Sequence, residues 1–211
     1  MSTSDLTAAH PDRSHAVHRD AFGAKLGMWL FLLSEAMLFG GLFVLYAMYR
    51  ATFPQAFHHG GTLMNGVLGA VNTLVLLSGS AAVAMSVTAV LRNQRRLAVA
   101  LVGSTVLSGA VFMGIKAVEW THHLHEGLYP SAAALQGDHG LQMFFALYYT
   151  MTGLHGIHVL VGMGLLIWAL TLVARGRVTA ERVTLLDNVA LYWHLVDVIW
   201  IFLLGLFYAA A

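Results

Sequence analysis

Residues Leu141–Ala174 read LQMFFALYYTMTGLHGIHVLVGMGLLIWALTLVA, 34 positions without an Asp, Glu, Lys or Arg. An α-helix rises about 1.5 Å per residue, so about 20 apolar residues cross about 30 Å of hydrocarbon. The segment therefore predicts a membrane-spanning helix that tilts or projects beyond the bilayer. A strand of a membrane barrel is a poor fit, because such strands alternate apolar and polar residues over about ten positions.

Four more apolar runs have the length of a membrane span: Leu26–Tyr49, Gly66–Leu91, Leu97–Trp120 and Val189–Ala211. The composition agrees, since 58% of the residues are hydrophobic and 10% are charged, against about 25% charged in soluble domains. The sequence predicts an all-α, polytopic membrane helix bundle with five transmembrane helices. This domain covers residues 26–211 and follows a polar, His-bearing N-terminal tail over residues 1–25.

The basic residues at the ends of the spans predict the orientation. Nine lie on the side of the N-terminus: Arg13, Arg19, Lys25, Arg92, Arg95, Arg96, Arg175, Arg177 and Arg182. The opposite side has Arg50 alone. Because Lys and Arg are enriched in cytoplasmic loops, we expect a cytoplasmic N-terminus and an external C-terminus.

Composition also excludes several kinds of site. The chain has no cysteine, so it cannot form a disulfide scaffold, a thiolate zinc or iron–sulfur site, or a thiolate bond to haem. A net charge of +1 gives no electrostatic footprint for nucleic acid. We therefore expect membrane lipids and other membrane proteins, and no nucleic acid, as partners.

Four ionisable side chains fall inside the predicted spans: Glu35, Lys116, Glu119 and Asp197. A charge at the centre of a lipid-facing helix costs a few kcal/mol, so each of these groups needs a partner inside the protein or in water. Lys116 and Glu119 are three residues apart on one helix face. They predict an intramembrane ion pair near the external end of the third span.

Glu35 and Asp197 lie ~13 Å and ~12 Å from the cytoplasmic ends of their spans at about 1.5 Å per residue. His194 precedes Asp197 by three positions, and His155 and His158 have the same spacing. These five residues predict a polar cluster in the cytoplasmic half of the bundle. Three uses remain open at this point: axial haem ligation in a free-standing b-type cytochrome, proton or ion coupling in a carboxylate-driven transporter, and hydrogen bonding between packed helices.

Four segments on four different spans carry a family resemblance. They are GMWLFLLSE at residues 27–35, NTLVLLSG at 72–79, GLHGIHV at 153–159 and YWHLVDVIW at 192–200. In this order they resemble subunit III of the haem-copper respiratory oxidases. The family's intramembrane glutamate falls on Glu35, and its paired-histidine helix falls on His155 and His158. The resemblance covers residues 25–208.

The resemblance implies a noncatalytic subunit III of a proton-pumping oxygen reductase, most similar to cytochrome c oxidase, in the respiratory chain of a bacterial plasma membrane. Haem and copper would lie in partner subunits I and II, so no catalytic, cofactor or metal residue is expected in this chain. It would stabilise subunit I, support proton uptake through the polar cluster and bind phospholipid. The chain has five spans where longer members have seven, and the two missing helices form one wall of a lipid cleft. A quinol oxidase subunit III and an accessory subunit of nitric oxide reductase are the alternatives within the resemblance.

Overall fold

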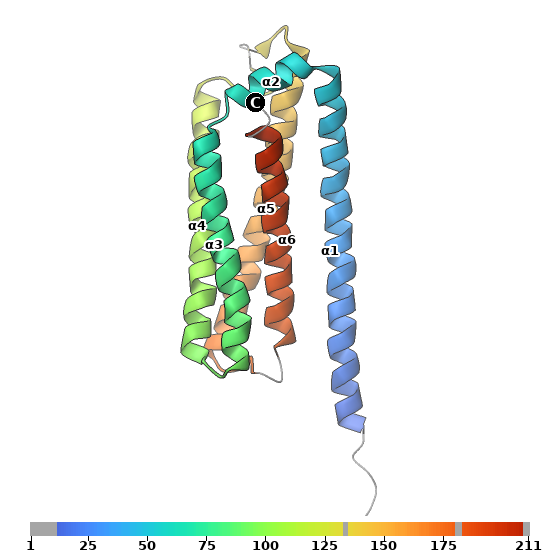
Figure 1. The fold of residues 1–211 in the computed structure, drawn as a ribbon, viewed down its shortest axis with the longest axis vertical. Coiled ribbons are helices and arrows are strands. Elements are labelled where there is room, and N and C mark those ends of the chain that lie inside the picture. The colour runs from blue at the N-terminus through green and yellow to red at the C-terminus, as the bar shows by residue number, and fades with distance from the viewer. Residues whose placement is uncertain (1–11, 133–134, 180–182, 209–211) are drawn as a thin grey trace, which may run out of the picture.

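The computed structural model describes residues 12–132, 135–179 and 183–208, with side chains from residue 22 onward. The described chain forms a bundle of long helices that run side by side, with one short helix across the top (Figure 1). The helices are α1 Asp12–Thr52, α2 Pro54–Thr62, α3 Gly66–Leu91, α4 Arg95–His125, α5 His139–Ala174 and α6 Thr184–Phe207. The all-α prediction is confirmed.

Five of these helices are long and apolar enough to cross a membrane: α1, α3, α4, α5 and α6. The prediction of five spans is therefore confirmed, and α5 extends over 36 residues. The sequence analysis missed α2, which lies within the expected connection between the first two spans. Its segment PQAFHHGGT has too few apolar residues to show a periodic pattern, although Pro54 at the first helical position is a common start signal.

The first helix begins earlier than the apolar pattern predicted. Residues 12–25 of the predicted tail are helical and continue directly into the first span, so α1 projects past the other helices at its N-terminal end (Figure 1). Lys25 forms an ion pair with Asp187 at the start of α6, with 2.9 Å between Nζ and Oδ2. This contact ties the base of α1 to the bundle. Residue His10 and the side chains of His15 and His18 lie outside the described part.

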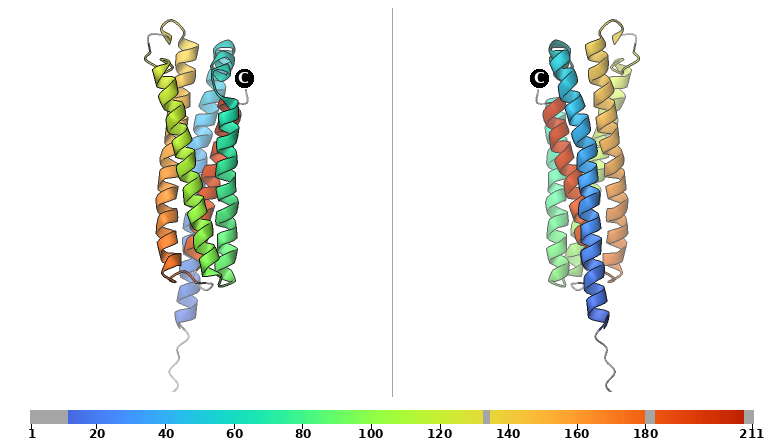
Figure 2. Two further views of the ribbon diagram at one scale, coloured as in Figure 1. Left: turned by 90° about the vertical axis from the view of Figure 1, so that its left-hand side faces the viewer. Right: turned by 90° about the vertical axis from the view of Figure 1, so that its right-hand side faces the viewer.

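Helix α6 is the centre of the bundle and α1 stands at its side. Neighbours of α6 are α1, α3 and α5, whereas α1 contacts α2, α5 and α6 (Figure 2). Half of the residues in the most apolar stretch of α6 are buried, compared with 11% of the residues in the same kind of stretch of α1. Most of the α1 surface is therefore free to face lipid or another subunit.

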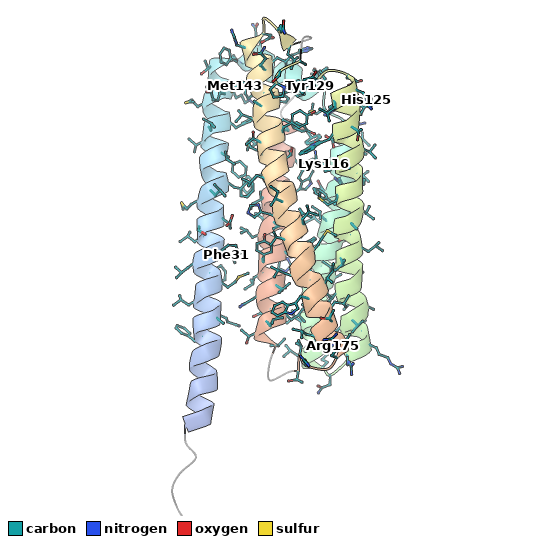
Figure 3. All side chains as sticks on the ribbon, turned by 180° about the vertical axis from the view of Figure 1, so that it is seen from behind. Phe31, Lys116, His125, Tyr129, Met143 and Arg175 are labelled. Atoms are coloured by element: carbon teal, nitrogen blue, oxygen red, sulfur yellow. The ribbon has the colours of Figure 1, made fainter. Side chains whose placement is uncertain are left out.

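The core between the helices is aromatic. Trp193, Trp200, Tyr148, Phe144 and Phe207 are fully buried. The rings of Phe144 and Phe207 meet edge to face with centroids 5.6 Å apart, which joins α5 to α6. Nearer the N-terminal end of α1, Phe31 stacks on Tyr192 of α6 at 5.9 Å (Phe31 is labelled in Figure 3). Ring contacts of this kind position the polar groups described below.

Close backbone approach at Gly79 joins α3 to α4. A Cβ atom at Gly79 would lie 2.0 Å from the Ser108 hydroxyl oxygen and 3.0 Å from the Ser108 Cβ atom, so a larger residue would require the Ser108 side chain to move. Small residues at such positions let membrane helices pack closely. The α3–α4 hairpin is thereby held as one unit beside α6.

The orientation of the bundle remains a prediction that a reporter can test. Alkaline phosphatase, which is active only outside the cytoplasm, should be active when fused after Ala211 or after Gly127. It should be inactive when fused after Asn93, in the turn between α3 and α4. The reverse pattern would overturn the orientation drawn from the basic residues.

Candidate functional site

Glu35 of α1 and His158 of α5 form a pair between two helices. The Oε2 atom of Glu35 lies 2.8 Å from Nε2 of His158. The other ring nitrogen, Nδ1, lies 2.8 Å from the backbone carbonyl oxygen of Leu154, one turn earlier on α5. The Glu35 carboxyl needs a partner, for which the sequence offers His155 or His158 on the fourth span, and the structure places His158 beside it.

These two distances require one exchangeable proton in the pair. A carbonyl oxygen only accepts hydrogen bonds, so Nδ1 of His158 carries a hydrogen and donates it to Leu154. In a neutral ring Nε2 is then an acceptor, and Glu35 must be protonated to donate to it. In a charged ring Nε2 donates, and Glu35 is a carboxylate. Either way one proton lies between Oε2 and Nε2, and it can be held on either atom.

The surroundings of the pair orient the imidazole and leave it partly accessible. The edge of Phe39 meets the His158 ring at 5.3 Å between centroids. The Tyr192 hydroxyl donates to the backbone carbonyl of His158 at 3.2 Å. The side chains of Glu35 and His158 are 16% and 14% exposed. The pair is therefore held in place, yet its proton is within reach of the outer surface between α1 and α5.

The other three residues of the predicted cluster do not contact this pair. His194 makes its contact with Ser80 on α3, with 2.5 Å between Nδ1 and Oγ. His155 lies between Trp200 and Phe112, at 5.3 Å and 5.7 Å between ring centroids, and neither of its ring nitrogens has a hydrogen-bond partner.

Asp197 is buried beside Ser80, but neither carboxylate oxygen has a partner at hydrogen-bond geometry. The predicted cluster therefore divides into the Glu35–His158 pair, the surroundings of Ser80 with His194 and Asp197, and His155 among aromatic rings. The cause is helix geometry, because residues three apart point about 60° away from one another. That angle directs His158 toward α1 and His155 into the core, whereas His194 and Asp197 both lie near Ser80.

Two segments of the family resemblance pack against each other. Trp200 of α6 donates from its indole nitrogen to the Thr73 hydroxyl of α3 at 2.9 Å. Six residues earlier on α6, His194 contacts Ser80, which lies seven residues after Thr73. The two helices run antiparallel, so these two contacts follow each other along the α3–α6 interface. They join residues 72–80 to residues 192–200. Asp197 lies between His194 and Trp200 on α6, and so between these two contacts.

Lys116 and Glu119 form the predicted ion pair, with 3.3 Å between Nζ and Oε1. The pair is not at a helix surface, because both side chains are more than nine-tenths buried. Tyr148 of α5 and Tyr208, which caps α6, complete a cluster around it. Lys116 donates to Tyr148 at 3.1 Å and to Tyr208 at 2.7 Å, and both tyrosines donate to Glu119. Lys116 lies at the end of the bundle opposite Arg175 (Figure 3).

The sequence analysis missed the two tyrosines of this cluster. Tyr148 lies in an apolar run, and Tyr208 lies 92 residues after Lys116, so neither is linked to the pair by local spacing. One signal was available: a tyrosine inside a membrane span needs a partner for its hydroxyl.

The histidines of the predicted cluster differ in how many of their ring nitrogens already have a contact. Both ring nitrogens of His158 are engaged, and Nδ1 of His194 contacts Ser80. His155 has free nitrogens, but its ring is enclosed by Trp200 and Phe112. Across the described residues, the structure brings together no group of three or more His, Asp or Glu side chains that could hold a metal ion.

Comparison with known proteins agrees with this architecture. A family model described as cytochrome c oxidase subunit III matches residues 8–211. The chain is 33% identical over 205 residues to cytochrome c oxidase subunit 3 of Thermostichus vulcanus, covering 96% of this chain and 93% of that one. It is 31% identical to cytochrome bo(3) ubiquinol oxidase subunit 3 of Pseudomonas aeruginosa, covering 90% and 86%. It is also 31% identical to a probable quinol oxidase subunit 3 of Staphylococcus haemolyticus, covering 85% of each chain.

The buried cluster predicts a difference between single and double substitutions. Lys116→Met should cost about 3–5 kcal/mol of stability, because it leaves the Glu119 carboxylate buried without its cation. Lys116→Met combined with Glu119→Gln should recover most of that loss, and Tyr208→Phe alone should cost about 1–3 kcal/mol. Thermal unfolding of the purified protein in detergent measures all three. Equal stability of the single and double variants would argue against the pair.

Proposed function

The chain belongs to the cytochrome c oxidase subunit III family and is a haem-copper oxidase subunit, and we propose that its Glu35–His158 pair supports proton uptake by the catalytic subunit. In this proposal the chain is a noncatalytic subunit that packs beside subunit I and stabilises it. Haem and copper lie in subunits I and II and supply the oxygen chemistry there. The complex lies in a bacterial plasma membrane, as expected from relatives in Thermostichus, Pseudomonas and Staphylococcus.

The observation that carries the proposal is the single proton that the geometry demands between Oε2 of Glu35 and Nε2 of His158. At 2.8 Å a proton can pass from one atom to the other without movement of the heavier atoms. A supply route requires a group that can take up a proton and release it again. Of the polar groups described above, this pair combines an exchangeable proton with partial exposure.

The position of the pair supports the same role. It lies at the α1–α5 contact, and α1 is the span with the smallest buried share. A catalytic subunit that packs against this side would face the pair directly. The predicted orientation puts Glu35 in the cytoplasmic half of the membrane, from which an oxidase that pumps protons outward must draw them. In this proposal the buried side chains stabilise the bundle, and the pair near the outer surface takes part in proton transfer.

Hydrogen bonding that only fixes α1 to α5 is the competing function. It rests on the same contact, since an interhelical hydrogen bond in a membrane contributes about 0.6–2 kcal/mol. The two differ in one respect that can be measured. A packing role requires only a side chain at position 35 that can hydrogen-bond to His158. A proton role requires a side chain that can gain and lose a proton.

Glu35→Gln is therefore the informative change. The glutamine amide can donate to Nε2 of His158, so the helix contact is kept while the exchangeable proton is removed. In the assembled oxidase we expect slower turnover and earlier inactivation during sustained turnover. The effect should grow from about pH 6 to about pH 9, where protons become scarce. Oxygen consumption over time measures both quantities.

The matched control is Glu126→Gln. Glu126 also pairs with a histidine, His122 at 3.2 Å, but that pair is exposed and lies on α4 at the other end of the bundle. It should leave turnover and lifetime unchanged. If Glu35→Gln behaves like this control across the pH range, with subunit III confirmed in the complex, Glu35 has a packing role only.

The electron donor is the finer part of the proposal. The relatives are named after both cytochrome c and quinol oxidases, and we propose cytochrome c oxidase because of the Glu35 segment and the closing segment at residues 192–200. The alternatives are a quinol oxidase subunit III and an accessory subunit of nitric oxide reductase. The complex that copurifies with a tagged chain should oxidise reduced cytochrome c with oxygen. Oxidation of quinol alone, or reduction of nitric oxide alone, would select an alternative.

A further inference from the structure

A groove opens at the end of the bundle away from the Lys116 cluster, where α4 begins and α5 ends. It has a volume of about 900 Å³. Its lining is formed by the turn before α4, the first residues of α4 and the last residue of α5: Asn93, Gln94, Arg95, Arg96, Leu97, Val99 and Ala174. In Figure 1 this end of α4 lies on the side of the bundle opposite α1, so the groove is separate from the Glu35–His158 pair.

The polar side of the groove is strongly cationic. Arg95 and Arg96 line it, and three more arginines lie in the adjoining turns: Arg92, Arg175 and Arg177. All five are exposed. Residues 88–99 and 170–179 include no Asp or Glu, so this positive charge has no acidic neighbour within these segments. Such a surface attracts anions, and it does so over about one Debye length, roughly 8 Å at physiological salt.

The other side of the groove is apolar. Leu97, Val99 and Ala174 line it, and Leu97 is 48% exposed. Arg95 lies at the edge of the groove, and its guanidinium is beside the turn after α5. A Cβ atom at Gly176 would be 3.4 Å from an Arg95 nitrogen, and Gly176 has a φ of +69° that favours glycine. This distance places the Arg95 guanidinium beside the Gly176 turn, at the mouth of the groove.

We propose that this groove binds an anionic phospholipid of the surrounding leaflet, with its phosphate on Arg95 and Arg96 and an acyl chain along Leu97 and Val99. The two-sided lining favours a lipid over a free anion, which would leave the apolar side unused. The location favours it as well, since α4 and α5 are membrane spans and the groove lies where they leave the membrane. Basic pockets between transmembrane helices on the cytoplasmic side are suited to acidic headgroups.

This inference depends on the membrane spans and on the charge pattern, and not on the proton role of Glu35. It also differs from the lipid cleft implied by the family resemblance. One wall of that cleft is formed by two helices that this chain lacks, whereas the groove is formed entirely by α4 and α5.

A photoreactive lipid tests the proposal in the assembled oxidase. The probe is phosphatidylglycerol with a diazirine in its acyl chain, added to the delipidated complex in detergent, and the readout is the labelled peptide. We expect labelling within residues 95–100. The double variant Arg95→Gln, Arg96→Gln should reduce the apparent affinity about 30-fold, as two lost surface charges imply.

The matched control removes the same charge from the neighbouring turn. Arg175→Gln with Arg177→Gln should lower the affinity by clearly less than the first double variant does, because neither side chain lines the groove and their effect on the phosphate is screened by salt. The same diazirine in phosphatidylcholine should label this peptide weakly. Retention of subunit III in each complex shows that the variants assemble.

Three outcomes would overturn the proposal. The first is equal labelling by the two lipids, which would indicate a non-specific lipid contact. Equal loss in the two double variants would indicate a general charge effect. Complete displacement of the probe by inorganic phosphate, or by glycerol phosphate at the affinity of the lipid, would indicate an anion site without an acyl-chain component.

Discussion

A polar side chain inside a bilayer must find its hydrogen-bond partners within the protein, and this requirement decides which helices of the bundle are neighbours. Lipid offers no donor or acceptor, and several hydroxyl, imidazole and charged groups of this bundle meet their partner on a second helix. Glu35 joins α1 to α5, Thr73 joins α3 to α6, and Lys116 joins α4 to α5 and to the end of α6. Aromatic packing then fills the spaces that these contacts define.

Local spacing was sufficient to predict some of this arrangement. The five spans follow from long apolar runs, because crossing about 30 Å of hydrocarbon leaves few alternatives. The Lys116–Glu119 pair follows from its i, i+3 spacing within one helix. For Glu35, the need for a partner narrowed the choice to two histidines, and the structure selects His158.

Local spacing could not predict contacts between helices that are far apart in the sequence. One sequence gives the rotation of each helix only coarsely, and about 60° separates His155 in the core from His158 facing α1. The predicted cluster of five therefore divides into separate sites. Tyr208 reaches Lys116 across 92 positions, and α2 has too little apolar character to be recognised. In each case the missing information was the relative placement of helices.

Glu35 and Glu119 each belong to a group of polar side chains, but the two groups differ in exposure and in the number of hydrogen bonds to the carboxyl. Around Glu119, two tyrosines and Lys116 converge on one carboxylate oxygen, and the side chain is 3% exposed. A closed network of this kind resists change because moving one proton disturbs several bonded groups at once in a low dielectric. Glu35 has one partner and is 16% exposed, so a proton can leave it at the cost of a single hydrogen bond. The closed cluster therefore suits a stabilising role, and the open pair at the least buried span suits the proton exchange that we propose.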